Sequence, residues 1–283
     1  MTAILLDFSQ RPELALHARV VADIESVAAP MGISPMITGA FARDLHLLHG
    51  CCIDMQRKTE DIDFGMAVAD WTAFAALREG LSASGNFQAS PGVVHRLRHR
   101  NGLPVDLVPF GSNIETDKRK IAWPPAGDVV MDVFGFREAL ASAQPVMLPG
   151  NVQTWVVSLA ALALLKIVCW QERHYRSPRK DAHDIALILQ NYLAASNEAR
   201  LWDEFLDWTQ RDDFQYELAG PQMLGHDMGL LLDSPGRDFV AGLLLAQVDP
   251  DQPGVLPSEM SLNEPERARE WLVALLRGLQ PLV

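Results

Sequence analysis

The chain has 283 residues, and 36 acidic against 24 basic side chains give it a formal net charge of −12. Hydrophobic residues make up 48% and charged residues 21% of the sequence. This is the composition of a folded globular protein, and it excludes a disordered chain, a disulfide-stabilised miniprotein and a collagen-like chain. The acidity also argues against a protein that coats nucleic acid or an anionic membrane, because such affinity comes mainly from Lys and Arg.

Several sequence features predict a cytoplasmic protein with no membrane partner. The three cysteines, Cys51, Cys52 and Cys169, are too few for a disulfide framework and fit a reducing compartment. The N-terminus lacks the basic start and apolar core of a signal peptide. The most apolar window, residues 155–168, contains Lys166 and is shorter than the roughly 18–20 residues that a bilayer requires.

The first half of the chain mixes helical and strand patterns. Apolar residues recur at helical spacing in three segments, which predicts helices over residues 12–29, 41–48 and 71–81. Short alternating or β-branched segments predict strands over residues 36–38, 60–68, 93–100, 103–110, 129–134 and 145–148. Asp70 is a natural N-cap for the third helix. Asn101-Gly102 predicts a hairpin with a type I′ turn, and we expect a hinge at Pro149-Gly150.

The second half reads as helical throughout. The pattern predicts helices over residues 154–173, 178–195, 199–209, 236–247 and 265–279. Ser177 is the expected N-cap of the second of these, with Pro178 at its first helical position. The predicted fold class is therefore α+β, with a mixed β-sheet flanked by helices over residues 1–150 and an all-helical domain over residues 151–283.

Two carboxylates lie one residue apart in the strand predicted over residues 60–68. Because residues i and i+2 of a strand face the same side, Asp61 and Asp63 project together, while Ile62 and Phe64 anchor the opposite face. Carboxylates this close repel each other unless a cation lies between them, and Mg²⁺ prefers such oxygen ligands. The alternative is a solvated strand face, which is common for an isolated pair of this kind.

Two further features favour the metal interpretation. Gly39-Ala40 lies at a strand-to-helix junction, where small residues let backbone N–H groups approach a phosphate. Asp106 lies in an apolar strand, where a carboxylate is costly unless it is paired or bound to metal. If this strand lies beside the first, the three aspartates could hold two metal ions about 3.5–4 Å apart, with Asp106 as ligand or base, an arrangement suited to nucleotidyl transfer.

A small-residue turn, a D-h-D strand (h, hydrophobic) and a third Asp on a later strand resemble the nucleotidyltransferase superfamily with the polymerase-β-type fold. Within it, the chain is most similar to the AbiEii-type toxin nucleotidyltransferase family over residues 36–190. That family has a helical Lys segment, which resembles Leu164-Leu165-Lys166 with Arg173, and a D-x-x-D motif, which resembles Asp181 to Asp184. The turn departs from the family's usual Gly-Ser or Gly-Gly, because Ala40 lacks the hydroxyl.

The resemblance implies a nucleotidyltransferase (catalytic) domain over residues 1–150 that uses Mg²⁺, as one or two ions, and an NTP as substrate. It also implies a tRNA acceptor and toxin activity with an antitoxin protein as partner. The metal and catalytic residues it implies are Asp61, Asp63 and Asp106. The nucleotide-binding residues it implies are Gly39, Ala40, Arg43, Lys166, Arg173, Asp181 and Asp184.

The residues leave several alternatives open. Lys166, Trp170 and Arg173 share one helix face, where they could meet a triphosphate and a base or simply belong to the protein core. Asp181 and Asp184 could equally form a structural ion pair. Arg96, Arg98 and Arg100 on one strand face are either solvated or reach a polyanionic acceptor. Three other functions compete with this one. The first is a transferase with a small-molecule acceptor, as in antibiotic nucleotidyltransferases, and the second is a non-catalytic nucleotide- or partner-binding member of the fold. A D-x-D glycosyltransferase is a weaker third.

Overall fold

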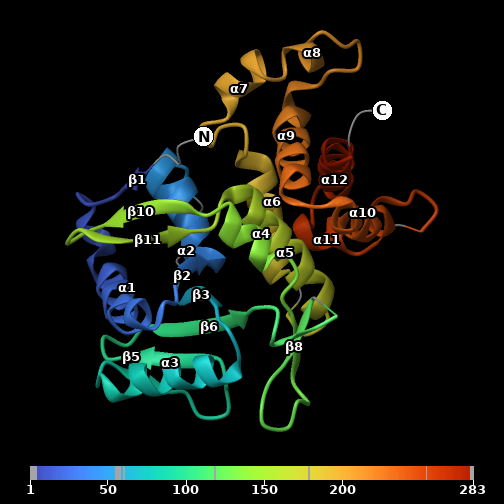
Figure 1. Ribbon diagram of the computed structural model, residues 1–283. Coiled ribbons are helices and arrows are strands. Elements are labelled where there is room, and N and C mark those ends of the chain that lie inside the picture. The colour runs from blue at the N-terminus through green and yellow to red at the C-terminus, as the bar shows by residue number, and fades with distance from the viewer. Residues whose placement is uncertain are drawn as a thin grey trace. The chain divides into compact units, whose positions relative to one another are not determined.

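The computed structural model describes residues 5–54, 59, 61–117, 119–177, 179–252 and 254–280. The chain divides into two compact units (Figure 1). The first consists of Met1–Leu45 with Gln56–Ser158, and the second of His46–Met55 with Leu159–Val283. No helix in the described part of the chain combines the length and apolar character needed to cross a bilayer.

The first unit is built on a mixed sheet, which in the described residues has eight strands in the order β1-β10-β11-β2-β3-β6-β5-β4. These strands are β1 (Leu6–Asp7), β2 (Pro35–Thr38), β3 (Ile62–Ala67), β4 (Phe87–Ala89), β5 (Arg96–His99), β6 (Pro104–Phe110), β10 (Gln144–Leu148) and β11 (Val152–Val156). A separate small antiparallel sheet contains β7 (Glu115–Thr116), β8 (Lys120–Ala122) and β9 (Val130–Asp132). The predicted mixed sheet is confirmed.

Helices flank this sheet, as predicted. They are α1 (Ala15–Ala28), α2 (Gly39–Asp44), α3 (Trp71–Ala83) and α4 (Phe136–Ala141), with short 3-10 turns at Pro12–Leu14 and Ala29–Met31. A π-helical turn at Leu45–Gly50 continues from α2. The predicted N-cap of α3 is confirmed, because the Asp70 carboxylate accepts a hydrogen bond of 2.8 Å from the Ala73 N–H. α1 buries Val20, Val21 and Ile24 completely and packs on β2 and β11.

Strand register aligns the candidate site residues of neighbouring strands. β2 pairs with β3 in antiparallel fashion, and Thr38 lies opposite Asp63. β3 pairs with β6 in parallel, and Asp63 lies opposite Asp106. β5 pairs with β6 in antiparallel fashion, and Arg96 lies opposite Asp106. The middle of the sheet therefore places both of these aspartates and Arg96 in one row across neighbouring strands.

The hairpin between β5 and β6 is confirmed, but its predicted type I′ turn is wrong. His99 N–H donates to the Leu103 carbonyl, and Gly102 N–H donates to the His99 carbonyl, with distances of 2.9 and 2.8 Å. The loop therefore contains three residues and ends at Gly102, whose φ of +95° suits the left-handed last position of such a loop. A two-residue turn would have shifted the register by one residue.

The helix predicted to start at residue 154 is wrong at its beginning. Val152–Val156 forms β11, and α5 begins only at Leu159. Alternation explains the strand, since Thr154 and Val156 are buried while Trp155 is exposed. The expected hinge at Pro149-Gly150 lies in the turn that joins β10 to β11, with Gly150 at a φ of +79°.

In its described residues the second unit has helices and loops but no strand, which confirms the predicted helical C-terminal part, although β11 lies inside the range 151–283 that was expected to be all-helical. Its helices are α5 (Leu159–Arg173), α6 (Lys180–Asn191), α7 (Glu198–Asp203), α8 (Leu206–Thr209), α9 (Tyr216–Leu231), α10 (Ser234–Val248), α11 (Leu256–Met260) and α12 (Pro265–Leu279). The single helix predicted over 199–209 is two short ones. Ser177 is not the N-cap of α6, because Arg179 takes that position with a φ of +72°; Pro178 lies outside the described residues.

α9 was not predicted from the sequence, because Gly220, Pro221 and two further glycines weaken the helical pattern. These glycines allow close packing of α9 on α12. A Cβ at Gly225 would lie 1.9 Å from the Leu275 carbonyl oxygen, and a Cβ at Gly278 would lie 1.8 Å from the Gln222 carbonyl oxygen. Glycine therefore lowers the intrinsic helix propensity of these segments, but it lets the backbones of α9 and α12 come close together.

Candidate active site

Three carboxylates converge in the first unit. One oxygen each from Asp61, Asp63 and Asp106 lies within 4.8 Å of the others. Asp61 directly precedes β3, Asp63 lies in β3, and Asp106 lies in the adjacent parallel strand β6. Ile62 and Phe64 are completely buried on the other side of β3. The alternation seen in the sequence thus separates an apolar anchor from a cluster of carboxylate oxygens of the kind that Mg²⁺ prefers.

The turn before α2 is shaped around this carboxylate cluster. Gly39 has a φ of +66°, and a Cβ there would lie 1.8 Å from the Asp63 carboxylate oxygen Oδ2. Any side chain at this position would therefore meet both backbone strain and a direct clash. Gly39 lets Asp63 pass close to the main chain at the junction of β2 and α2.

We expect Gly39→Ala to lower nucleotidyl transfer by roughly 100-fold, because it must push the Asp63 carboxylate out of place. The left-handed backbone should also cost about 1–2 kcal/mol of unfolding free energy. Gly32→Ala is the matched control, since Gly32 has a φ of +70° but no atom within 4 Å of an added Cβ. Initial rates and urea unfolding of both variants test this. Equal activity losses in the two variants would contradict a specific role for Gly39.

Arg43 was predicted to contact the nucleotide, and the geometry argues against it. Its side chain is completely buried, and its Nη2 lies 2.6 Å from Oδ1 of the neighbouring Asp44. The Thr59 hydroxyl donates to the other oxygen of Asp44. This arrangement ties α2 to the segment that leads into Asp61, so Arg43 supports the site from within the protein.

Arg96 lies against the carboxylate cluster, which the sequence reading did not foresee. Its Nε and Nη2 donate to the two oxygens of Asp106 at 2.7 and 2.6 Å, and Nη2 lies 3.4 Å from Asp61 Oδ2. The hydrogen bond to Asp106 raises the pKa of Arg96 further above its already high ordinary value. Arg98 instead donates to the Gly102 carbonyl at 2.8 Å. The three arginines on one strand face therefore have different surroundings.

The four charged residues predicted in the second unit form one ion-pair network. Lys166 Nζ lies 3.2 Å from Asp181 and 2.6 Å from Asp184, and Arg173 Nε lies 2.7 Å from Asp181. Burial alone would raise the pKa of Asp181, but the hydrogen bond from Arg173 and the charge of Lys166 lower it to about 2. Burial alone would lower the pKa of Lys166, but the charges of Asp184 and Asp181 outweigh it and raise the pKa.

This network favours the structural alternative for α5 and α6. Lys166 is only 6% exposed, and Asp181 and Asp184 are 1% exposed each. Two cations and two carboxylates balance each other, as buried charges must. Trp170 is also buried, and its indole N–H donates to Glu259 at 2.6 Å. An indole held in this way packs inside the protein, which favours the core alternative for this helix face.

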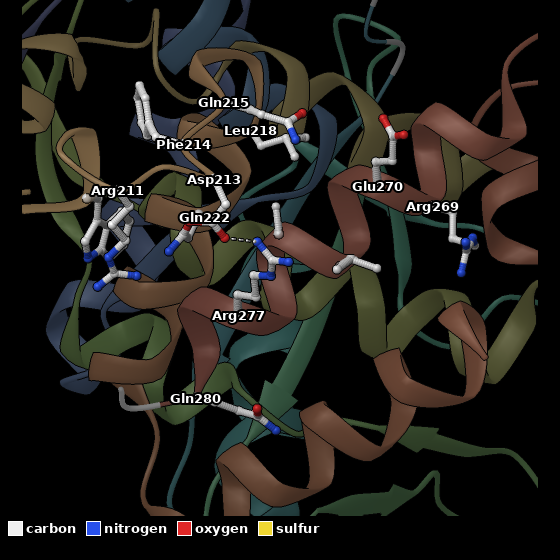
Figure 2. A pocket seen from close by; sticks show the side chains of 13 residues that line it. Arg211, Asp213, Phe214, Gln215, Leu218, Gln222, Arg269, Glu270, Arg277 and Gln280 are labelled. Atoms are coloured by element: carbon white, nitrogen blue, oxygen red, sulfur yellow. Dashed lines mark ion pairs between the residues drawn. The ribbon is translucent and has the colours of Figure 1, made fainter. Parts of the chain in front are cut away.

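A cavity of about 550 Å³ occurs in the second unit, where α9 and α12 contribute Gln222 and Arg277 to its wall (Figure 2). Arg277 turns toward Asp213, with 3.6 Å between Nη1 and Oδ2. None of the residues predicted to bind metal or nucleotide lines this cavity. The candidate active site is therefore the carboxylate cluster of the first unit.

A mixed sheet that gathers three aspartates beside a glycine turn is the arrangement expected from the resemblance to nucleotidyltransferases. Residues 36–271 match the family described as "Nucleotidyl transferase AbiEii toxin, Type IV TA system". The chain belongs to this family, which confirms the resemblance seen in its motifs. The comparison with curated proteins finds no match.

The solved structures to which the chain is similar include two of the antibiotic-resistance factor ANT(2'')-Ia. The solution structure is 13% identical with a TM-score of 0.37, and the match covers 70% of this chain and 99% of that one. The crystal structure in complex with adenylyl-2''-tobramycin is 16% identical with a TM-score of 0.35, covering 65% and 98%.

Proposed function

We propose that this nucleotidyltransferase moves a nucleoside monophosphate from an NTP to an acceptor hydroxyl, with pyrophosphate as the leaving group, at the carboxylate cluster of the first unit. The observation that carries the proposal is the convergence of Asp61, Asp63 and Asp106 within 4.8 Å. The first unit would then supply the catalytic domain and the second unit the helical domain, with the boundary after Ser158 instead of the expected residue 150.

The donor set fits Mg²⁺, because all three side chains offer hard carboxylate oxygens and Gly39 leaves room for Asp63. Asp61 and Asp63 would hold the metal, and Asp106 would be a further ligand. When bound, one or two Mg²⁺ ions would neutralise phosphate charge and lower the pKa of the attacking hydroxyl. The single positive charge of Arg96 does not balance three carboxylates, and the remaining repulsion between them supports a further cation at this site.

The protein's own groups would perform the remaining tasks. Asp106, which was expected as ligand or base, would accept the proton of the acceptor hydroxyl. The backbone N–H groups of Gly39 and Ala40, at the start of α2, would bind phosphate oxygens. The network of Lys166, Arg173, Asp181 and Asp184 would support the helical unit, and any contact with the triphosphate falls to Arg173, whose side chain is 41% exposed.

The family description supports a toxin with an antitoxin protein as its partner, acting in the cytoplasm. The acceptor would then be tRNA, and Arg98 and Arg100 are exposed residues that could meet its phosphates. With a net charge of −12, such binding would depend on local cations of this kind. A small-molecule hydroxyl is the alternative acceptor.

The test is incubation of the purified protein with each α-³²P-labelled NTP, with Mg²⁺ or with EDTA, and with bulk tRNA, a panel of aminoglycosides or no acceptor. We expect label to move to an acceptor only when Mg²⁺ is present. Label on RNA supports the tRNA acceptor, and label on a small molecule supports the alternative. Absence of NTP binding together with transfer to neither acceptor would overturn the proposed activity.

A further inference from the structure

Arg96 occupies the place at the carboxylate cluster where a cation is needed. We propose that Arg96 is a built-in competitor of the metal, so that its guanidinium offsets part of the negative charge of the metal-free cluster and metal binding must displace it from Asp106. This inference rests on the proposed function, because it assumes that the cluster binds a divalent metal. Competition from Arg96 would set the metal concentration at which the carboxylate cluster becomes occupied.

The contacts of Arg96 carry the argument. Its two donor nitrogens engage both oxygens of Asp106 at 2.7 and 2.6 Å, and one of them also approaches Asp61 at 3.4 Å. Such two-pronged, charge-assisted pairs are the strongest hydrogen bonds between side chains. A metal ligated by Asp106 would have to share these oxygens with a guanidinium of like charge. The two cations therefore compete for one site.

The position of Arg96 also allows its side chain to move away from Asp106. The Arg96 side chain is 35% exposed whereas the Asp106 side chain is 11% exposed, so the arginine is more open to water than the carboxylate. The main chain of Arg96 is fixed by its pairing opposite Asp106 in β5 and β6. A long side chain on a fixed strand can swing toward solvent without moving the sheet, and it needs only rotamer changes to do so.

Arg98 offers a matched control in the same strand. It lies two residues along β5, and its Nη1 donates to the carbonyl of Gly102 in the hairpin loop at 2.8 Å. Arg98→Gln removes the same charge from the same strand face while leaving the carboxylate cluster intact. Any effect seen in Arg96→Gln but not in Arg98→Gln is therefore specific to the cluster.

The experiment is a Mn²⁺ titration of wild type, Arg96→Gln, Arg96→Lys and Arg98→Gln without NTP, in which the EPR signal of free Mn²⁺ reports binding. We expect Arg96→Gln to bind Mn²⁺ roughly tenfold more tightly than wild type, and Arg98→Gln to match wild type. Arg96→Lys, which has one charged head in place of a fork, should lie between them. The melting temperature of Arg96→Gln should be lower than wild type without metal and should rise more on addition of Mn²⁺.

Equal or weaker Mn²⁺ binding by Arg96→Gln would overturn the inference, because Arg96 would then hold Asp106 in place for the metal. If Arg96→Gln is unfolded without metal, Arg96→Lys must bind measurably more tightly than wild type, and equal affinity overturns the inference. Mn²⁺ binding by wild type that is lost in Asp61→Asn supports the proposed metal site whatever Arg96 does. Absence of Mn²⁺ binding in wild type and in every variant would overturn both.

Discussion

Replacement of Asp61 or Asp63 by asparagine is expected to lower kcat/KM for nucleotidyl transfer on the order of 10³-fold, because each change removes a metal-ligating charge worth several kcal/mol to the transition state. The protein should stay folded. Asn keeps the shape of Asp, and removing one of three carboxylates within 4.8 Å relieves repulsion in the metal-free protein. Initial rates and Mn²⁺ titrations of the same preparations measure both consequences.

The control is Asp70→Asn. Asp70 is a carboxylate of the same unit that caps α3, and Asn is an equally good N-cap. This variant therefore removes one negative charge without touching the cluster, and it should retain wild-type activity and metal affinity. Transfer activity that survives in both Asp61→Asn and Asp63→Asn, with unchanged metal binding, would contradict the proposed site.

Lys166→Met is expected to destabilise the protein by about 3–5 kcal/mol, since it removes the positive charge that forms ion pairs with two buried carboxylates. Asp184 loses its 2.6 Å ion pair with Lys166, whereas Asp181 loses Lys166 and keeps its ion pair with Arg173. Urea unfolding followed by circular dichroism measures the change. The predicted direct contact of Lys166 with a triphosphate would instead give a stable variant with weaker NTP binding.

Two further variants sharpen this prediction. Lys180→Met removes a charge from an exposed lysine at the start of α6, and the change in unfolding free energy should be within about 0.5 kcal/mol. Adding Asp184→Asn to Lys166→Met removes one of the buried negative charges that Lys166 balanced, so the double variant should be more stable than Lys166→Met alone. A double variant that is less stable than the single one would contradict the ion-pair explanation.

The carboxylate cluster shows how far local pattern reaches. Ile62 and Phe64 anchor β3, and the period of two residues alone placed Asp61 and Asp63 on the other face. Asp106 stood out as a charge in an apolar strand, and the residue is buried in the structure. Gly39 stood out as a small residue before a helix. Each of these signals depends only on residues that are close together in the chain, so the sequence alone was enough to predict these positions.

Arg96 shows where local pattern ends. The sequence predicted a two-residue turn, whose register would have placed Leu97 opposite Asp106 and Arg96 on the other face of the sheet. The actual three-residue loop places Arg96 opposite Asp106. A shift of one residue exchanges the two faces of a strand, and turn residues alone did not settle it.

Strand period, helix period and isolated charges are properties of neighbouring residues, so local pattern was enough to predict the mixed sheet, the helical second half and the aspartates of the candidate site. The partners of Arg96 and Lys166 and the existence of α9 could be seen only in the folded protein. These features depend on strand register and on helix packing, as when Gly225 of α9 meets the backbone of Leu275. Their energy comes from contacts between segments far apart in the chain.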